Sequence, residues 1–372
     1  MLKRFGSTTM IEPIQRLRPS SWQWRRLAPA LLMVGGAVLM AYVPYLISDF
    51  YLNVLTEILV YGLLATSINI LMGYTGLTSL GHAAYFGLAA YTCAYLVLKD
   101  KQGFLVAFLV GLVVATVSSA IFGAIALRAT GIYFLMITLA LNMLVYGTAY
   151  TLYPITNAEN GMYGVTRPDF VFQDYQYYWF TLVVVAISFF LVWRLVYSPF
   201  GLTLMGIRES ESRMRTLGYN VFLHKLIAFT ISGFFAGLAG CLYVFFDSGV
   251  SPATVGLSVS IEGVLEVLIG GIGTLFGPLL GAAIIVTARE ILSLQVGRWP
   301  TVLGLLLIVI VLFARKGILG AVYDWLAQRR GTAVNGGPSG EESQQPNWQA
   351  ADEQAVPEDQ PPAAPVPQPE PS

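Results

Sequence analysis

The run FLVAFLVGLVVATVSSAIFGAIAL, residues 104–127, contains no charged side chain from end to end. A helix needs about 20 mainly apolar residues to cross the hydrocarbon core of a bilayer, which is roughly 30 Å thick. This run is long enough to do so, and its glycine, alanine and serine residues would allow close contact with a neighbouring helix. The sequence therefore predicts a membrane-spanning helix at this place.

Similar runs recur along the whole chain. Hydrophobic residues make up 56% of it and charged residues only 11%, whereas soluble proteins carry roughly 25% charged residues. We expect an all-α, polytopic transmembrane bundle of about ten spans, at residues 27–47, 52–72, 79–98, 104–127, 132–153, 178–197, 226–246, 259–272, 275–292 and 301–314. The eighth and ninth runs are rich in glycine and lie close together, so they are either two spans or one span and a re-entrant helix.

Basic residues fall on alternate loops of this arrangement. Six precede the first predicted span, and others on the same side are Arg128, Arg194, Arg208, Arg213, Arg215, Lys225, Arg315 and Lys316. The opposite side has only Lys99, Lys101, Arg167 and Arg298, accompanied by several carboxylates. Loops rich in lysine and arginine stay in the cytoplasm. We therefore expect a multi-pass membrane protein with both termini in the cytoplasm.

Two terminal segments differ in composition from the apolar runs of the central part of the chain. Residues 1–26 form a basic segment, predicted to be cytoplasmic, and residues 27–320 form the transmembrane domain. Residues 331–372 consist mainly of proline, glutamate, glutamine and alanine. Such a composition cannot bury enough apolar surface to fold, so this tail is predicted to be disordered and cytoplasmic.

The loop 198–225, SPFGLTLMGIRESESRMRTLGYNVFLHK, is the longest predicted cytoplasmic segment apart from the tails. Its charges alternate from residue 206 to 217, and apolar residues recur at roughly helical spacing. This pattern predicts one short amphipathic helix that ends at Gly218. It is either a solvated surface helix or a docking helix for a soluble partner.

Four blocks decide between these alternatives. They are NILMGYTGLTSLGHAAYFGLAAY (69–91), GIYFLMITLALNMLVY (131–146), IRESESRMRTLGYN (207–220) and SIEGVLEVLIGGIGTLFGPLLGA (260–282). In order and character they resemble the LivM-type family of branched-chain amino-acid permeases of ABC transporters. The third block is similar to the coupling-loop motif of such permeases, E-A-A followed by glycine, with Ser210 and Ser212 in place of the alanines.

The resemblance implies a permease subunit of a bacterial-type inner membrane that imports branched-chain or related amino acids. Its implied partners are two cytoplasmic ATPase subunits, a second homologous permease, an extracytoplasmic solute-binding protein and the lipid bilayer, without nucleic acid. The implied coupling residues are Arg208, Glu209, Glu211, Arg213, Leu217 and Gly218. Urea or a short amide is an alternative solute, and a self-sufficient secondary transporter is an alternative class.

Polar residues within the predicted spans are candidates for the solute pathway: Thr75, Ser79, His82, Tyr85, Asn142, Glu262 and Glu266. Carboxylates at such depth are costly, so the two glutamates either serve transport or form a fixed contact between helices. Their block and that around His82 are both interrupted by glycine and occupy comparable places in the two halves, which indicates a faint internal repeat. We expect Arg289 to reach the membrane interface or to pair with Glu290 at the surface.

The sequence lacks the signatures of an enzyme. It has no phosphate-binding G-x-x-x-x-G-K-[ST] loop, so ATP and magnesium would be used by the partner ATPases and not by this chain. It has two histidines and no zinc-binding spacing, so we expect neither a metal nor a cofactor in this subunit.

Overall fold

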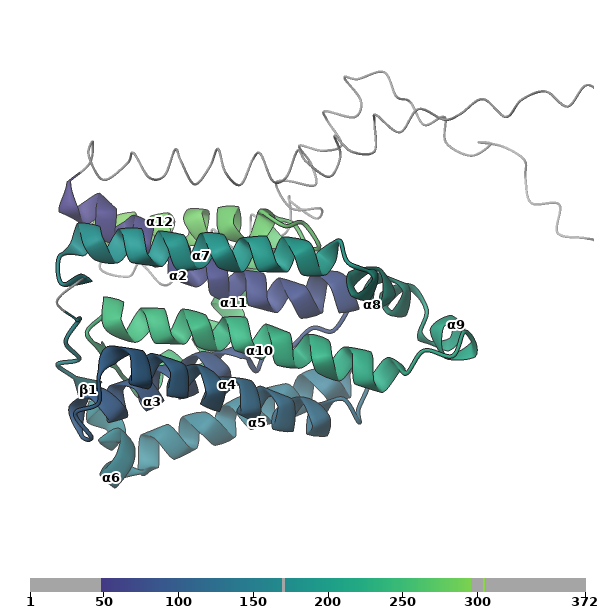
Figure 1. The fold of residues 1–372 in the computed structure, drawn as a ribbon, viewed down its shortest axis with the longest axis horizontal. Coiled ribbons are helices and arrows are strands. Elements are labelled where there is room, and N and C mark those ends of the chain that lie inside the picture. Colours follow the sequence, from purple (N-terminus) through teal and green to yellow (C-terminus); the bar gives the residue numbers. More distant parts are fainter. Residues whose placement is uncertain (1–47, 169–170, 296–303, 305–372) are drawn as a thin grey trace, which may run out of the picture. The chain divides into compact units, whose positions relative to one another are not determined.

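The chain folds into a bundle of helices, known here from a computed structural model that describes residues 48–168, 171–295 and 304. Figure 1 shows the bundle, which also contains a small two-stranded β-ribbon. The longer helices are α2 (Asp49–Asn69), α3 (His82–Leu98), α4 (Phe104–Ala126), α5 (Ile132–Thr151), α7 (Asp174–Val196), α10 (Val221–Phe246), α11 (Leu257–Gly270) and α12 (Gly277–Gln295). This architecture confirms the predicted helical membrane bundle.

Short elements gather at the two ends of the bundle. At one end lie α6 (Tyr153–Thr156), the 3₁₀ turns η3 (Ala158–Asn160) and η5 (Pro252–Val255), and an antiparallel ribbon of β1 (Met162–Tyr163) and β2 (Gly249–Val250). At the other end lie α8 (Pro199–Glu209) and α9 (Glu211–Thr216), as Figure 1 shows. We call these the ribbon end and the α8–α9 end.

The helices α2 and α10 occupy the centre of the bundle. We compared how many residues of the most apolar stretch of each helix are buried. The share is 83% in the span that begins with α2 and 72% in α10, but only 22% in α4 and 28% in α5. The large apolar side chains on the outer helices therefore face outward. In a chain with this composition the surrounding solvent for them is lipid, which supports the membrane assignment.

The two faces of α4 differ in side-chain size. Every fourth residue on the outer face is large and exposed: Leu105, Leu109, Val113, Val117, Ile121 and Ile125. Every fourth residue on the inner face is small and buried: Ala107, Gly111, Ala115, Ser119 and Gly123. A Cβ added to Gly233 of α10 would stand 2.1 Å from the Cβ of Ser119, and one at Gly237 would stand 2.3 Å from that of Ala115. Small residues thus bring α4 and α10 into close contact, as is usual between helices in membranes.

Most predicted spans coincide with helices. Among the described residues, five helical segments are long and apolar enough to cross a membrane: Asp49–Thr75, Phe104–Ala126, Ile132–Thr151, Asp174–Val196 and Val221–Phe246. The helix α3 is shorter than predicted because it begins only at His82. The first and tenth predicted spans, both termini and the tail lie outside the described residues.

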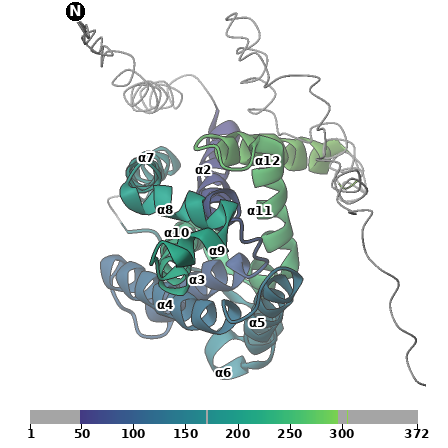
Figure 2. The ribbon, with the colours of Figure 1, turned by 90° about the vertical axis from the view of Figure 1, so that its right-hand side faces the viewer.

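The glycine-rich eighth and ninth runs form helices of unequal length. With 14 residues, α11 extends about 21 Å, less than the thickness of a hydrocarbon core. Figure 2 looks along α2, α7 and α10 and shows α11 from the side, running across them. Of the two alternatives, the structure favours a partial helix followed by the longer α12, which has 19 residues.

The helix α2 does not end at a capping side chain. Its last turns widen into a π-helix, η2 (Ile70–Thr75), which Gly76 terminates with φ at +74°. A residue other than glycine seldom adopts this conformation. A π-helical turn disrupts the regular backbone hydrogen-bond ladder and frequently marks a functional site. This turn lies against α8, as the tertiary contacts show.

Candidate functional site

The loop that was predicted as one amphipathic helix consists of two helices. The prediction of continuous helix over residues 206–217 is wrong, because the chain is extended at Ser210, with φ at −161° and ψ at 105°. The hydroxyl of Ser210 accepts a hydrogen bond from the backbone N–H of Arg213 and so caps the start of α9. Serine favours this cap position over the interior of a helix. As predicted, the loop helix ends at Gly218, whose φ is +86°.

The exposed side of α9 and its flanking residues is rich in charge. Glu209, Arg213 and Arg215 are exposed, and Leu217 is exposed to 71%. The inward side is held by packing, since a Cβ at Gly206 of α8 would stand 2.9 Å from Sδ of Met214 in α9. The hairpin of α8 and α9 thus presents charges and one large apolar side chain at the end of the bundle.

Two side chains of this hairpin bond to the bundle although neither of them is buried. Glu211 forms an ion pair with Lys225 at the start of α10, whose side chain is only 8% exposed. Arg208 donates a hydrogen bond to the carbonyl of Gly73 in the π-helix. The hairpin is therefore attached to both central helices. The sequence predicted Arg208 and Glu211 as coupling residues together with the others, and the structure distinguishes these two by their bonds to Gly73 and Lys225.

The buried polar residue His82 begins α3 in the interior of the bundle. Its Nε2 lies 2.7 Å from the hydroxyl of Ser232, which donates in turn to the carbonyl of Ser67 at 2.6 Å. The ring also stands edge-to-face with Tyr85, at 6.1 Å between centroids. His82 thereby links α3 to the central helices α2 and α10, and its Nδ1 has no hydrogen-bond partner among the described residues.

Three other predicted pathway residues serve backbone groups. Thr75 donates to the carbonyl of Leu71 within the π-helix, and Ser79 accepts from the N–H of Gly81. Asn142 donates to the carbonyl of Val255 at 3.2 Å, which joins α5 to η5. All three are buried. The structure brings His82 and Tyr85 together but places Thr75 at the α8–α9 end.

The charged cluster of the interior consists of Glu57, Arg289, Glu262 and Glu266. Arg289 lies between Glu57 of α2 and Glu262 of α11, with 2.9 Å from its Nη1 to Oε1 of Glu262. Its guanidinium also stands 5.1 Å above the ring of Tyr61. Glu57 lies eight residues into α2, about 12 Å along the helix axis, so the cluster lies within the helical bundle and away from the start of α2.

The cluster corrects the expectation for Arg289, and it adds Glu57 and Arg289 to the polar residues found inside the bundle. Arg289 neither reaches the interface nor pairs mainly with Glu290, because its side chain is only 15% exposed and Glu290 stands 3.9 Å away. Sequence reasoning missed Glu57 and the pairing of Arg289, although a carboxylate within an apolar run is a usable signal. Glu266 is fully buried, and neither of its carboxyl oxygens has a hydrogen-bond partner among the described residues.

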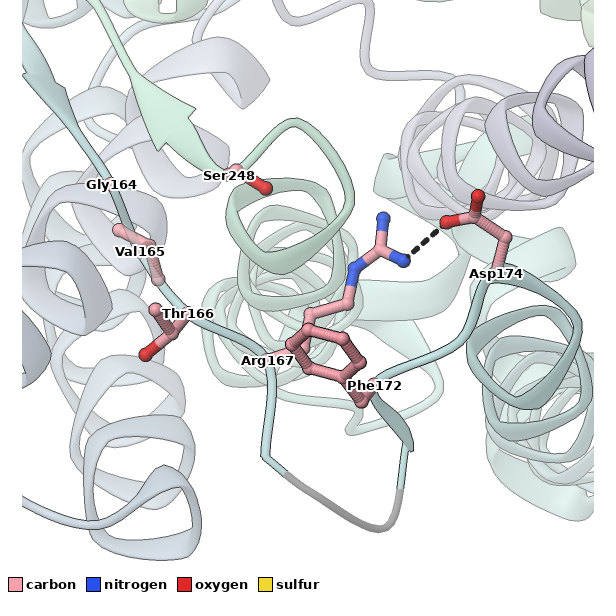
Figure 3. Close-up of a pocket in the computed structure, with 7 residues that line it drawn as sticks. All are labelled: Gly164, Val165, Thr166, Arg167, Phe172, Asp174 and Ser248. Carbon is pink, nitrogen blue, oxygen red and sulfur yellow. Dashed lines mark hydrogen bonds and ion pairs between the residues drawn. The ribbon is translucent and has the colours of Figure 1, made fainter.

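A shallow pocket of about 390 Å³ lies at the ribbon end and is shown in Figure 3. Arg167, which lines it, forms an ion pair with Asp174 at 2.6 Å and donates to the carbonyls of Phe245 and Phe246. These bonds tie the segment before α7 to the end of α10. The arginine therefore has a structural role that accounts for its position.

The sequence was also compared with known proteins. The family described as the permease component of branched-chain amino acid transport systems matches residues 50–314. The chain belongs to this family. Its members are membrane transport subunits rather than enzymes, and they bind no cofactor themselves. Among the described residues no group of three histidine, cysteine, aspartate or glutamate side chains is arranged to hold a metal ion.

Individual members of the family show moderate similarity to this chain. The permease LivM of the high-affinity branched-chain amino acid transport system of Escherichia coli is 26% identical over 330 residues, which cover 82% of this chain and 78% of that protein. The probable branched-chain amino acid transport permease LivH of Methanocaldococcus jannaschii is 27% identical over 257 residues, which cover 64% of this chain and 78% of that protein. The permease LsrC of the autoinducer 2 import system of E. coli is 26% identical over 144 residues, covering 36% and 41%. This member of the permease family is therefore a multi-pass membrane protein that resembles import permeases for more than one solute.

Proposed function

We propose that this permease forms one half of the translocation pathway of an ATP-driven importer and carries branched-chain or related amino acids. The α8–α9 end faces the cytoplasm in this proposal, because the basic residues gather there. Two ATPase subunits bind at this end, a second homologous permease completes the pathway, and a solute-binding protein delivers the amino acid on the other side. Both termini then lie in the cytoplasm.

The observation that carries the proposal is the attachment of the α8–α9 hairpin. Its outer side offers the exposed charges of Glu209, Arg213 and Arg215 together with the exposed Leu217. Its inner side is bonded to α10 through Glu211 and to the π-helix through Arg208. A solvated surface loop needs no such pair of contacts. A docking element that passes on a displacement needs an outward binding side and an inward attachment.

The solute pathway is proposed to use the buried polar groups near the middle of the bundle. His82 and Tyr85 lie on α3, Asn142 lies on α5, and Glu262 and Glu266 lie on α11. The carboxyl oxygens of Glu266 and Nδ1 of His82 have no hydrogen-bond partner among the described residues, and both residues are fully buried. In this proposal they meet an ammonium or carboxylate group of the solute when the pathway opens. The similarity to LivM supports an amino acid as solute, whereas the similarity to LsrC supports only the transport class.

The experiment that tests this function starts from the assembled complex. The tagged chain is purified in mild detergent, its partners are identified by mass spectrometry, and the complex is placed in liposomes with the binding protein. We expect ATP-dependent uptake of leucine, isoleucine or valine. Uptake of urea or a short amide instead would replace the solute but keep the class.

The charged cluster motivates one alternative function. A secondary transporter requires titratable or charged groups within the membrane, and Glu57, Arg289, Glu262 and Glu266 would supply them. In that case the chain would purify without ATPases, and uptake would persist without ATP as long as an ion gradient is present. That pair of results would overturn the proposed function.

A further inference from the structure

The two glycine-interrupted helix breaks of the chain touch each other at the α8–α9 end. The side chain of Asn69, the last residue of α2, spans the contact with both of its amide atoms. Its Oδ1 accepts from the N–H of Gly273 at 2.9 Å, and its Nδ2 donates to the carbonyl of Thr274 at 2.8 Å. The break after α2 is thereby fixed to the break between α11 and α12.

The backbones at this contact lie too close for any side chain. A Cβ at Gly73 would stand 2.7 Å from the nitrogen and 2.8 Å from the Cα of Gly273, and 2.3 Å from Oδ1 of Asn69. Real Cβ atoms essentially never come so close to another backbone. We call this contact of Asn69, Gly73, Gly273 and Thr274 the break junction.

One side chain from the hairpin enters the break junction. Arg208 of α8 donates to the carbonyl of Gly73, and the same nitrogen would stand 3.5 Å from a Cβ at Gly273. Its stem passes Gly76, where an added Cβ would stand 3.0 Å from Cγ of Arg208. The positive charge therefore lies against both breaks at once. A hydrogen bond from an ionised donor is stronger than one between neutral groups.

We propose that Arg208 is a positioning residue that transmits a displacement of the α8–α9 hairpin to the break junction. The proposal rests on the proposed function, in which ATPase subunits move this hairpin. Arg208 is itself exposed, but unlike Arg213 and Arg215 of α9 it is bonded to the break junction. Binding of the ATPases and transmission to the spans therefore belong to different side chains in this proposal. Loss of Arg208 then separates ATP hydrolysis from transport without removing the ATPases.

The test measures ATP hydrolysis and solute uptake by the whole reconstituted complex. With Arg208→Met we expect the ATPases to co-purify and hydrolysis to continue, while uptake per ATP falls by about tenfold, the factor set by losing one charge-assisted hydrogen bond. Arg208→Lys keeps the charge and one donor, so it should restore part of the uptake. The matched control is Arg194→Met, because Arg194 is an exposed arginine at the same end but outside the hairpin.

A second readout distinguishes transmission from a merely structural role. Ile272, beside Gly273 and 39% exposed, is replaced by cysteine and labelled with a maleimide with and without ATP. We expect the labelling rate to respond to ATP when Arg208 is present and not to respond in the Arg208→Met complex. If the Met variant is not recovered as folded protein in the membrane, the Lys variant serves for the same comparison.

The outcomes separate this inference from the proposed function. Wild-type uptake per ATP in Arg208→Met would overturn the role of Arg208 while leaving the importer in place. Loss of the ATPases from that variant would also overturn it, since Arg208 would then be a docking contact. Absence of ATP-dependent uptake in the wild-type complex would instead overturn the proposed function.

Discussion

Arg289 of α12 and Glu57 of α2 form an ion pair in the interior of the bundle although 232 residues separate them in sequence. Glu262 of α11 is bonded to the same guanidinium. One arginine thus connects three helices, and its side chain and those of both partners are at most 20% exposed. Removing one member of a buried pair leaves a charge without compensation.

We therefore expect Arg289→Met to destabilise the folded protein by about 3–5 kcal/mol, the usual cost of breaking a buried ion pair. The measurement is the midpoint of thermal unfolding in detergent. Glu290→Gln is the control, because Glu290 stands 3.9 Å from Arg289 and is twice as exposed, at 32% against 15%. Equal midpoints for Arg289→Met and the wild type would contradict the assignment.

Glycine at position 73 is expected to tolerate no side chain. Gly73→Ala places a methyl group against the backbone of Gly273, so we predict a loss of folded protein in the membrane fraction. At Gly147 of α5 an added Cβ would meet nothing within 4 Å, so Gly147→Ala should be neutral or stabilise its helix by up to about 1 kcal/mol. The comparison uses fluorescence-detected size-exclusion chromatography. Equal yields would mean that the two breaks do not touch.

The conformation of Gly218 predicts which substitutions the hairpin accepts. Its φ of +86° is costly for a branched side chain, although no neighbour lies within 4 Å of an added Cβ. Gly218→Val should abolish ATP-dependent uptake while the protein still inserts into the membrane. Gly218→Asn should keep most of the uptake, since asparagine adopts this conformation more readily. Normal uptake by the valine variant would count against coupling through this loop.

The cap at Ser210 predicts a local change in hydrogen exchange. Ser210→Ala removes the acceptor for the N–H of Arg213 and should destabilise α9 by about 1 kcal/mol. Backbone amides of α9 would then exchange about fivefold faster, which mass spectrometry of deuterated peptides can detect. Ser212→Ala, two residues further and exposed, serves as control and should leave exchange unchanged. Identical exchange in both variants would disprove the cap.

The sequence alone was sufficient for the apolar helices because a membrane imposes a simple length requirement. The runs at 104–127 and 132–153 ended within two residues of α4 and α5. It was less reliable where one polar side chain decides the local backbone. Alternating charges from Arg208 to Arg215 predicted a continuous helix, and they concealed that Ser210 competes for the N–H groups of the next turn.

Contacts between distant residues were beyond sequence reasoning. No local pattern associates Arg289 with Glu57, or Asn69 with Gly273, since each pair is joined only when helices from opposite halves pack together. The sequence placed Arg208 among the coupling residues, but its bond to Gly73 could not be predicted because it depends on where the π-helix lies. The faint similarity of the two glycine-interrupted blocks did indicate related places in the chain, and the two breaks do touch.

The two faces of α4 have a consequence for which mutations this protein can accept. Both faces are apolar, so a hydropathy profile cannot distinguish them, whereas side-chain volume read at every fourth position does. Outward positions such as Val113 should accept any large apolar residue, because fluid acyl chains adapt to its shape. Inward positions such as Ala115 should reject even one added methylene, because Gly237 offers no space. Natural variation along this helix is thus expected to be limited by volume on one side and only by hydrophobicity on the other.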